Sequence, residues 1–250
     1  MILLGMTGPI GHGKTTFANA LSELVPGTRR LESSLVIAEI VDAFHASLKD
    51  IPDHHDIDTI NICLRSLPAI LLQTLHIHTT FEDIKLDPAD VASHPGDYQK
   101  LFLHIENLNR RPDLAKTLIT PDNKESFRPI LQWFGGYLVN KVDPGIWYHE
   151  LVRRTYEAKR EGCELCIVGG LRFPCDATLL RHAEAIIVKV YRPGHLQNDM
   201  LDPTERERGN IVVDTTVSSN GSVDDVKQTA IRLLADIKAN NLQATYQTIQ

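Results

Sequence analysis

The sequence is poor in cysteine, in net positive charge and in long apolar runs, and each of these shortages excludes a class of protein. Four cysteines in 250 residues are too few for a disulfide framework. The formal net charge of -6 argues against general nucleic-acid binding, which usually goes with a basic balance. No apolar run approaches the length of a membrane span, and no internal repeat is visible. We therefore expect neither a nucleic acid nor a membrane as a partner.

The remaining composition is typical of a cytoplasmic enzyme. The 250 residues, 42% of them hydrophobic, are enough for one sizeable α/β core with an appended lobe and too few for two independent large domains. A phosphate-binding motif begins at residue 8, so we expect no signal peptide before it and a location in the cytoplasm.

The main motif is GPIGHGKT at residues 8–15, which matches the phosphate loop G-x-x-x-x-G-K-[ST]. In such a loop, backbone N–H groups surround a phosphate, the lysine reaches the β- and γ-phosphates, and the Ser or Thr hydroxyl binds Mg²⁺. A buried strand at residues 2–4 and a helix at residues 14–24 provide its usual context. The phosphate-binding residues predicted here are Gly8, Gly11, His12, Gly13, Lys14, Thr15 and Thr16, with Thr15 as the metal ligand. For His12, an exposed loop position is an equal alternative.

The apolar runs 165–168 and 185–190 predict further strands of a parallel sheet, and short strands are also expected at residues 28–32 and 215–218. Functional residues gather where parallel strands end, because the binding crevice lies at that edge. Arg172 and Arg192 each follow one of these runs and are therefore well placed to meet a phosphate.

Apolar stripes at helical spacing predict the helices. The first predicted helix is 14–24, with Phe17, Leu21 and Leu24 on one face, and the second is 34–48, with Ser34 as its N-cap. A third begins with Ser126 as its N-cap, and a fourth covers 147–160 and is ended by Gly162. A last helix has an apolar face of Val226, Ala230, Leu233, Leu234 and Ile237. Arg128 and Gln132 are spaced i, i+4, so a guanidinium and an amide lie one above the other. Such a pair can grip a phosphate together with a base edge or a ribose.

The alternation of strands and helices is interrupted over residues 50–124, where prolines punctuate mostly helical segments. Two helices meeting near Pro68 are predicted within residues 57–75, and a helical stripe runs from Tyr98 to Leu108. We therefore expect a core at 1–49 and 125–240 with a lid at about 194–210, and an inserted helical lobe at 50–124 in which Arg65 could reach an anion.

No metal site made of side chains alone is predicted. The lobe is rich in histidine, but no cysteine or carboxylate spacing completes a recognised site, so surface or packing histidines are the better interpretation. Cys163 and Cys166 have metal spacing, yet Cys166 lies in the apolar run 165–168 and is interpreted as a buried strand thiol.

With these residues in hand, the chain resembles the deoxynucleoside monophosphate kinases of the phosphate-loop kinase superfamily. The resemblance covers residues 1–45 and 126–235. Beyond the phosphate loop, the residues that match the family pattern are Arg128, Leu131, Gln132, Gly135, Pro144, Trp147, Arg172-Phe173, Arg192-Pro193 and Asn220-Gly221.

The resemblance implies a three-layer α/β/α phosphate-loop kinase fold with a parallel sheet. It implies transfer of the ATP γ-phosphoryl group to a (deoxy)nucleoside monophosphate, giving the diphosphate, with Mg²⁺. The roles implied are catalysis by Lys14, Arg128 and Arg172, further ATP contacts from Arg206 and Asn220, and acceptor contacts from Arg128, Gln132, Trp147 and Arg65. A homodimer is left open.

Three positions depart from the family pattern. Gly170 stands where relatives carry the aspartate that supports Mg²⁺, and Asp176, Asp42 or Glu39 are the candidates to replace it. Gly136 and Asn140 stand where a threonine and an arginine are expected on the acceptor side. Two alternatives therefore stay open: a kinase for another small acceptor, such as a dephospho-coenzyme A or shikimate type, and a regulatory nucleotide-hydrolysing switch.

Overall fold

The computed structural model describes residues 1–48, 57–79, 94–111, 113–114, 117–120, 122–195 and 207–239. Contacts divide the chain into two compact units, one formed by Met1–Ser33 with Leu151–Gln250 and the other by Ser34–Glu150. These boundaries differ from those expected at residues 49 and 125, because the helices on either side of the 50–124 segment cluster with it. A substrate-binding role for 50–124 stays a prediction.

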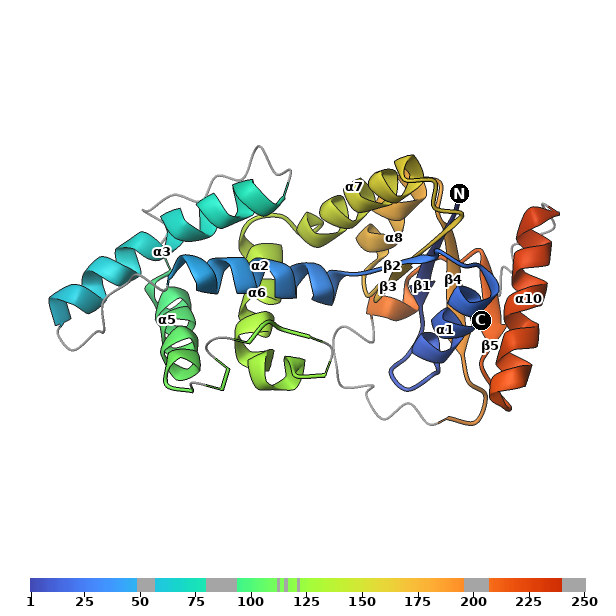
Figure 1. Cartoon of the computed structure of the whole chain (residues 1–250), viewed down its shortest axis with the longest axis horizontal. Coiled ribbons are helices and arrows are strands. Elements are labelled where there is room, and N and C mark those ends of the chain that lie inside the picture. Colours follow the sequence, from blue (N-terminus) through green and yellow to red (C-terminus); the bar gives the residue numbers. More distant parts are fainter. Residues whose placement is uncertain are drawn as a thin grey trace. The chain divides into compact units, whose positions relative to one another are not determined.

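The first unit is built on a sheet of five strands in the order β2-β3-β1-β4-β5 (Figure 1). Every adjacent pair is parallel. The strands are β1 (Ile2–Thr7), β2 (Arg29–Glu32), β3 (Leu165–Gly169), β4 (Ile186–Tyr191) and β5 (Thr215–Ser218). Each overlaps a strand expected from the sequence, so the α/β class with a parallel sheet is confirmed.

Helices cover both faces of this sheet. They are α1 (Lys14–Leu24), α8 (Pro174–His182) and α10 (Val223–Lys238). On one face, Leu4 and Met6 of β1 share a core with the buried side chains of α1 and α10. On the other face, a Cβ added to Gly5 would lie 3.1 Å from Cδ1 of Leu180 in α8. The sheet between α1 and α10 on one side and α8 on the other makes the three layers of the expected fold.

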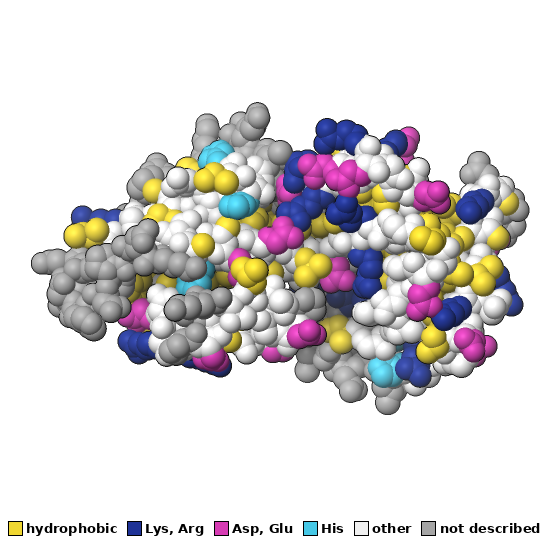
Figure 2. Space-filling model, in the orientation of Figure 1, with side chains coloured by type: hydrophobic (Ala, Val, Ile, Leu, Met, Phe, Trp, Pro, Cys, Tyr) yellow, Lys and Arg dark blue, Asp and Glu magenta, His cyan; other side chains and the backbone are white. Residues whose placement is uncertain are grey.

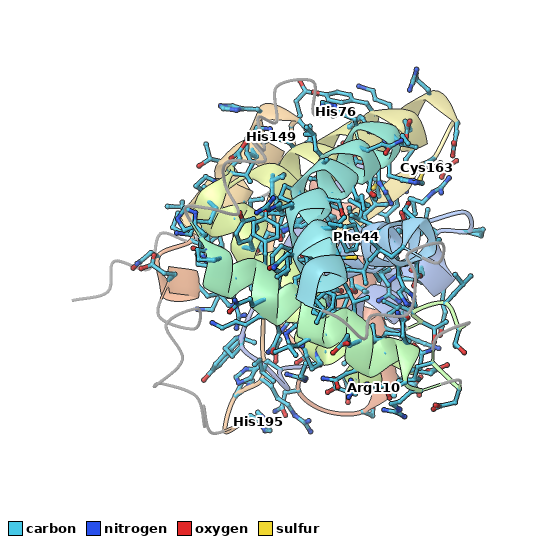
Figure 3. The ribbon with its side chains drawn as sticks, turned by 90° about the vertical axis from the view of Figure 1, so that its left-hand side faces the viewer. Phe44, His76, Arg110, His149, Cys163 and His195 are labelled. Atoms are coloured by element: carbon cyan, nitrogen blue, oxygen red, sulfur yellow. The ribbon has the colours of Figure 1, made fainter. Side chains whose placement is uncertain are left out.

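The second unit is helical. Its elements are α2 (Ser33–Ser47), α3 (Ile57–His78), α5 (Pro95–Asn109), the 3-10 helix η1 (Lys124–Phe127), α6 (Arg128–Lys141) and α7 (Ile146–Arg160), of which α2 and α7 continue into the first unit. Aromatic rings form its core: Phe44 of α2 meets Phe134 of α6 edge to face, and the Tyr137 hydroxyl of α6 donates a 3.1 Å hydrogen bond to the Tyr98 hydroxyl of α5. Figure 3 shows Phe44 among the helices and Arg110 at the outer edge.

The structure corrects the expected pair of helices that meet at Pro68. Helix α3 runs unbroken from Ile57 to His78 with Pro68 inside it. Proline removes one i→i−4 hydrogen bond from a helix, but that loss does not force the chain to stop. Burial of Leu67, Leu71 and Leu75 outweighs it here.

Helix α3 also corrects the statement that no apolar run reaches the length of a membrane span. Residues Ile60–His78 pass that test by length and composition, with a mean hydropathy of 1.3. Arg65, Gln73 and His76 are exposed on it while Leu71 and Leu75 are fully buried, as in an amphipathic helix of a protein core.

Three smaller expectations are also wrong. Helix α2 begins at Ser33, so Ser34 lies inside it instead of capping it. Helix α6 begins at Arg128 with Phe127 at the N-cap, because residues Lys124–Phe127 form a 3-10 turn before it, so Ser126 is not the cap. Leu24 is 37% exposed at the end of α1, where the helix has run past the core.

Candidate functional site

The order of the strands identifies the edge where a ligand should bind. The chain leaves β1 into α1 on one face of the sheet and leaves β3 into α8 on the other. In open parallel sheets, ligands bind in the crevice that opens at such a reversal, beyond the carboxyl ends of the strands. The crevice is therefore bordered by the loop that follows β1, at residues 8–13, and by the segment that follows β3.

The loop after β1 has the backbone conformation of a phosphate loop. Gly8 has φ 140°, and a Cβ there would lie 2.2 Å from the carbonyl oxygen of Val190. Gly13 has φ 79° and is the N-cap of α1, and a Cβ there would lie 2.8 Å from the Ser219 hydroxyl. Both positions require glycine, because a side chain would be strained and would collide with a neighbouring strand end.

Lys14 and Thr15 stand in the first turn of α1. The Lys14 ammonium donates hydrogen bonds of 2.7 Å to the carbonyl oxygens of Gly8 and Pro9, so it folds back over the loop. Thr15 and Thr16 are exposed at the positive end of the α1 dipole. The loop thus carries a cation, hydroxyls and a helix N-terminus, which together can bind a polyphosphate.

His12 is buried, which corrects the expectation that it might be an exposed loop residue; its side chain is 1% exposed. Its Nδ1 accepts a 3.1 Å hydrogen bond from the Arg192 backbone N–H, so in the neutral ring the proton is on Nε2. Its carbonyl oxygen accepts a 2.6 Å bond from the Ser219 hydroxyl, and its ring packs against Tyr191 and His195. His12 therefore ties the loop to the ends of β4 and β5.

We expect His12→Phe to lower the free energy of unfolding by about 1–3 kcal/mol. The substitution keeps an aromatic ring in place but removes the nitrogen that accepts the hydrogen bond from the Arg192 N–H. Urea denaturation monitored by circular dichroism measures this change. His182→Phe makes the same exchange at an exposed position of α8 and serves as the control. Equal stability of the two variants would contradict the anchoring role of His12.

The segment after β3 is held by a buried carboxylate. Asp176 is 2% exposed, and its Oδ2 accepts hydrogen bonds from the backbone N–H groups of Arg172 (2.9 Å) and Phe173 (3.0 Å). Burial raises the pKa of the Asp176 carboxyl, and the two N–H donors oppose that rise. Arg172 itself is exposed beside the crevice. Asp176, in the first turn of α8, is thus occupied by the N–H of the helix N-cap Phe173 and by that of Arg172, which weakens its candidacy as the carboxylate that supports a metal.

The other two candidate carboxylates lie in the second unit. Both oxygens of Asp42 accept from the Ile119 backbone N–H, at 3.3 and 3.1 Å, and desolvation raises the pKa of this carboxyl. Asp42 therefore secures the chain around residue 119. Glu39 is exposed on the same helix, α2.

The sequence analysis missed two residues at the strand ends. Ser219 follows β5 and holds the phosphate loop through His12. Glu32 ends β2, opposite Gly169 in the strand register. The position of Glu32 at the carboxyl end of a strand could have indicated a functional residue, but only the pairing of β2 with β3 shows that Glu32 lies opposite Gly169.

Two of the residues expected to hold the acceptor, Arg128 and Gln132, are exposed on α6. The Arg128 guanidinium makes a bidentate ion pair with Glu125, with Nε–Oε2 2.7 Å and Nη2–Oε1 2.9 Å. Gln132 lies one turn further along α6 and is exposed, as is Arg65 on α3. Trp147 is 4% exposed, and its Nε1 has no hydrogen-bond partner within the part of the chain that the structure describes.

The remaining candidates for ATP contacts are less defined. Asn220 is exposed after β5, and its N–H donates to the Ser218 hydroxyl at 3.3 Å. Arg206 and most of the expected lid at 194–210 lie outside the described residues. In the face shown in Figure 2, acidic and basic side chains are interspersed over the first unit, as the net charge suggests.

Cys166 has the burial of a structural thiol. Cys166 is fully buried in β3, and burial raises its pKa to about 12. The described residues contain no group of three or more His, Cys, Asp or Glu side chains that could hold a metal, and the exposed His76 at the end of α3 (Figure 3) belongs to none.

We therefore expect no stoichiometric zinc in the purified protein, because a thiol with so high a pKa is a poor metal ligand. Atomic absorption on protein purified without chelator is the measurement. One equivalent of zinc that Cys163→Ser removes would contradict this prediction.

No protein family and no curated protein matches this chain.

Proposed function

We propose that this protein transfers the γ-phosphoryl group of ATP to a nucleoside or deoxynucleoside monophosphate in the cytoplasm. The observation that carries the proposal is the glycine loop with Lys14 at the crevice beside β1, where its backbone is held by β4 and β5. Positioning and charge neutralisation do most of the work in this reaction, so few reactive side chains are required.

Lys14 would exchange neutral acceptors for charged ones when nucleotide binds. Its two present acceptors are the carbonyl oxygens of Gly8 and Pro9. A hydrogen bond to an anionic phosphate oxygen is roughly twice as strong as one to a neutral acceptor. The ammonium would therefore turn outward onto the β- and γ-phosphates and neutralise charge as the phosphoryl group moves.

The chain fits a magnesium ion that arrives with the nucleotide. When bound, such an ion would neutralise charge on the phosphates. Protein carboxylates need not surround it, because Mg²⁺ keeps several waters and takes only one or two protein ligands in such sites. The exposed Thr15 hydroxyl in the first turn of α1 would supply one ligand.

Arg128 and Gln132 of α6 would hold the monophosphate. Arg128 already binds a carboxylate in bidentate fashion, and a phosphate offers a guanidinium the same pair of oxygens with more charge. Arg172, exposed after β3, would add charge near the phosphoryl group in transit.

A coupled assay that follows ADP release from ATP, run over a panel of nucleoside and deoxynucleoside monophosphates, tests the proposal. We expect turnover that depends on one or a few of these acceptors. Activity only with hydroxyl acceptors such as dephospho-coenzyme A would indicate a kinase for another small acceptor and would refute the monophosphate as substrate. Slow hydrolysis of ATP or GTP that no acceptor accelerates would indicate a regulatory switch instead.

A further inference from the structure

Gly170, directly after β3, stands where a metal-supporting carboxylate is expected. The neighbouring strand β2 supplies a carboxylate at the same edge of the sheet. Glu32, the last residue of β2, is paired with Gly169, the last residue of β3. A Cβ added to Gly169 would lie 3.3 Å from Cγ and 3.4 Å from Oε1 of Glu32. The Glu32 side chain therefore lies over Gly169, in space that a larger residue would fill.

Glu32 is on the same face of the sheet as α1. Paired residues of parallel strands share a face, and Ile167, two residues before Gly169, belongs to the core that α1 covers. Glu32 and the first turn of α1 thus lie on one side of the sheet and at its carboxyl edge.

The contact between Arg30 and Asn19 shows how β2 and α1 are aligned. Arg30 Nη1 donates a 2.6 Å hydrogen bond to Asn19 Oδ1. From Asn19 back to Thr15 is one helical turn of about 6 Å toward the carboxyl edge, since α1 runs opposite to the strands. From Arg30 forward to Glu32 is about 6.6 Å in the same direction. Glu32 thus lies about as far beyond Arg30 toward the carboxyl edge as Thr15 lies beyond Asn19, on the side of α1 that Asn19 faces.

The side-chain lengths leave room for an ion between them. Arg30 spans the gap to α1 directly, and a glutamate is shorter than an arginine. Arg30 Nη2 lies 3.8 Å from Glu32 Oε1, a long ion pair that holds the carboxylate at the sheet edge. A carboxylate in this place would support an ion held at Thr15 through a water, since Mg²⁺ keeps several of its waters in such sites.

We propose that Glu32 is the carboxylate that supports the nucleotide-bound Mg²⁺ in this chain, in place of the aspartate that Gly170 replaces. The proposal rests on the proposed nucleotide binding at the phosphate loop. It makes Glu32 a positioning residue, which acts through a water ligand of the metal and not on the substrate.

Binding of the fluorescent nucleotide mant-ADP, measured in magnesium chloride and again in EDTA, tests this without turnover. The wild-type protein should bind more tightly with Mg²⁺. Glu32→Gln should reduce that Mg²⁺ enhancement about tenfold, which is the usual effect of losing an outer-sphere partner, and leave binding in EDTA unchanged. Glu164→Gln, an exposed glutamate just before β3, is the matched control and should keep the full enhancement.

A relocated carboxylate provides the second test. Glu32→Ala combined with Gly169→Asp puts an acid on β3 in the space that Glu32 occupies, and this double variant should regain Mg²⁺ enhancement relative to Glu32→Ala alone. A double variant no better than Glu32→Ala, with an unchanged melting temperature, would count against the placement.

The outcomes separate the two proposals. If the wild type binds mant-ADP in neither condition, the proposed function fails. If the wild type binds with Mg²⁺ enhancement and Glu32→Gln retains it in full, nucleotide binding stands and the role of Glu32 is refuted. A Glu32→Gln variant with normal enhancement and a raised KM for the acceptor alone would likewise refute it, and would place Glu32 at the acceptor.

Discussion

Lys14→Ala is expected to abolish phosphoryl transfer and to leave the fold intact. Lys14 is not part of the buried core of the sheet, and its ammonium donates to the carbonyl oxygens of Gly8 and Pro9 in its own loop, so we expect the core to tolerate its loss. In the reaction, the Lys14→Ala variant would lack a positive charge that the migrating phosphoryl group requires. Losing one such group typically costs about 10²–10³ in rate in electrostatic sites, and here the lysine also helps to bind ATP.

The circular dichroism spectrum of this variant should therefore match that of the wild type, while its steady-state turnover should be lost. Lys227→Ala removes a lysine that pairs with Glu23 on the surface of α10, and it should keep normal turnover. Wild-type activity in Lys14→Ala would refute the phosphate-loop assignment. An unfolded Lys14→Ala would instead assign the lysine a structural role in the loop.

Arg128→Lys is expected to raise the KM for the monophosphate about tenfold or more and to change that for ATP little. The fork that binds both oxygens of Glu125 is the geometry that a phosphate requires, and an ammonium cannot reproduce it. The loss of one charge-assisted hydrogen bond, about 1.5–3 kcal/mol, corresponds to that factor. Steady-state kinetics with each substrate varied in turn is the measurement.

Two further variants control this result. Glu125→Gln removes the charge that now holds Arg128 and should lower the KM for the monophosphate or leave it unchanged. Gln132→Ala should mainly reduce discrimination among bases, since an amide can pair with a base edge and adds no charge. If Arg128→Lys weakened ATP and monophosphate alike, or neither, α6 would not be the acceptor site, and α3 with Arg65 would be the next candidate.

The sheet and most helices could be predicted because their signals are local. The continuous apolar run 165–168 is typical of a buried strand, the stripe from Tyr98 to Leu108 repeats at the period of a helix, and both elements are confirmed. The start of α1 at Lys14, directly after the glycine loop, could be predicted for the same reason, since the glycines, Lys14 and the apolar stripe of α1 follow one another in the sequence.

The features that the sequence did not predict depend on residues far apart in the chain. Pro68 looks like a helix end until the burial of the leucines around it is known. His12 is buried only because β4 and β5 end beside it. The position of Glu32 over Gly169 follows from strand pairing, which a pattern within either strand cannot reveal.

The anchoring of the phosphate loop has a consequence for how the protein is made. The motif is complete once residue 15 has been synthesised, but its contacts come from Leu171, Arg192 and Ser219. Strand β1 likewise pairs only with β3 and β4, which follow it by more than 150 residues. Such non-local pairing is slow, because a long loop must close before any contact rewards it. A nascent chain on the ribosome therefore carries the glycine motif without the strands that hold it in place until nearly the whole first unit has emerged.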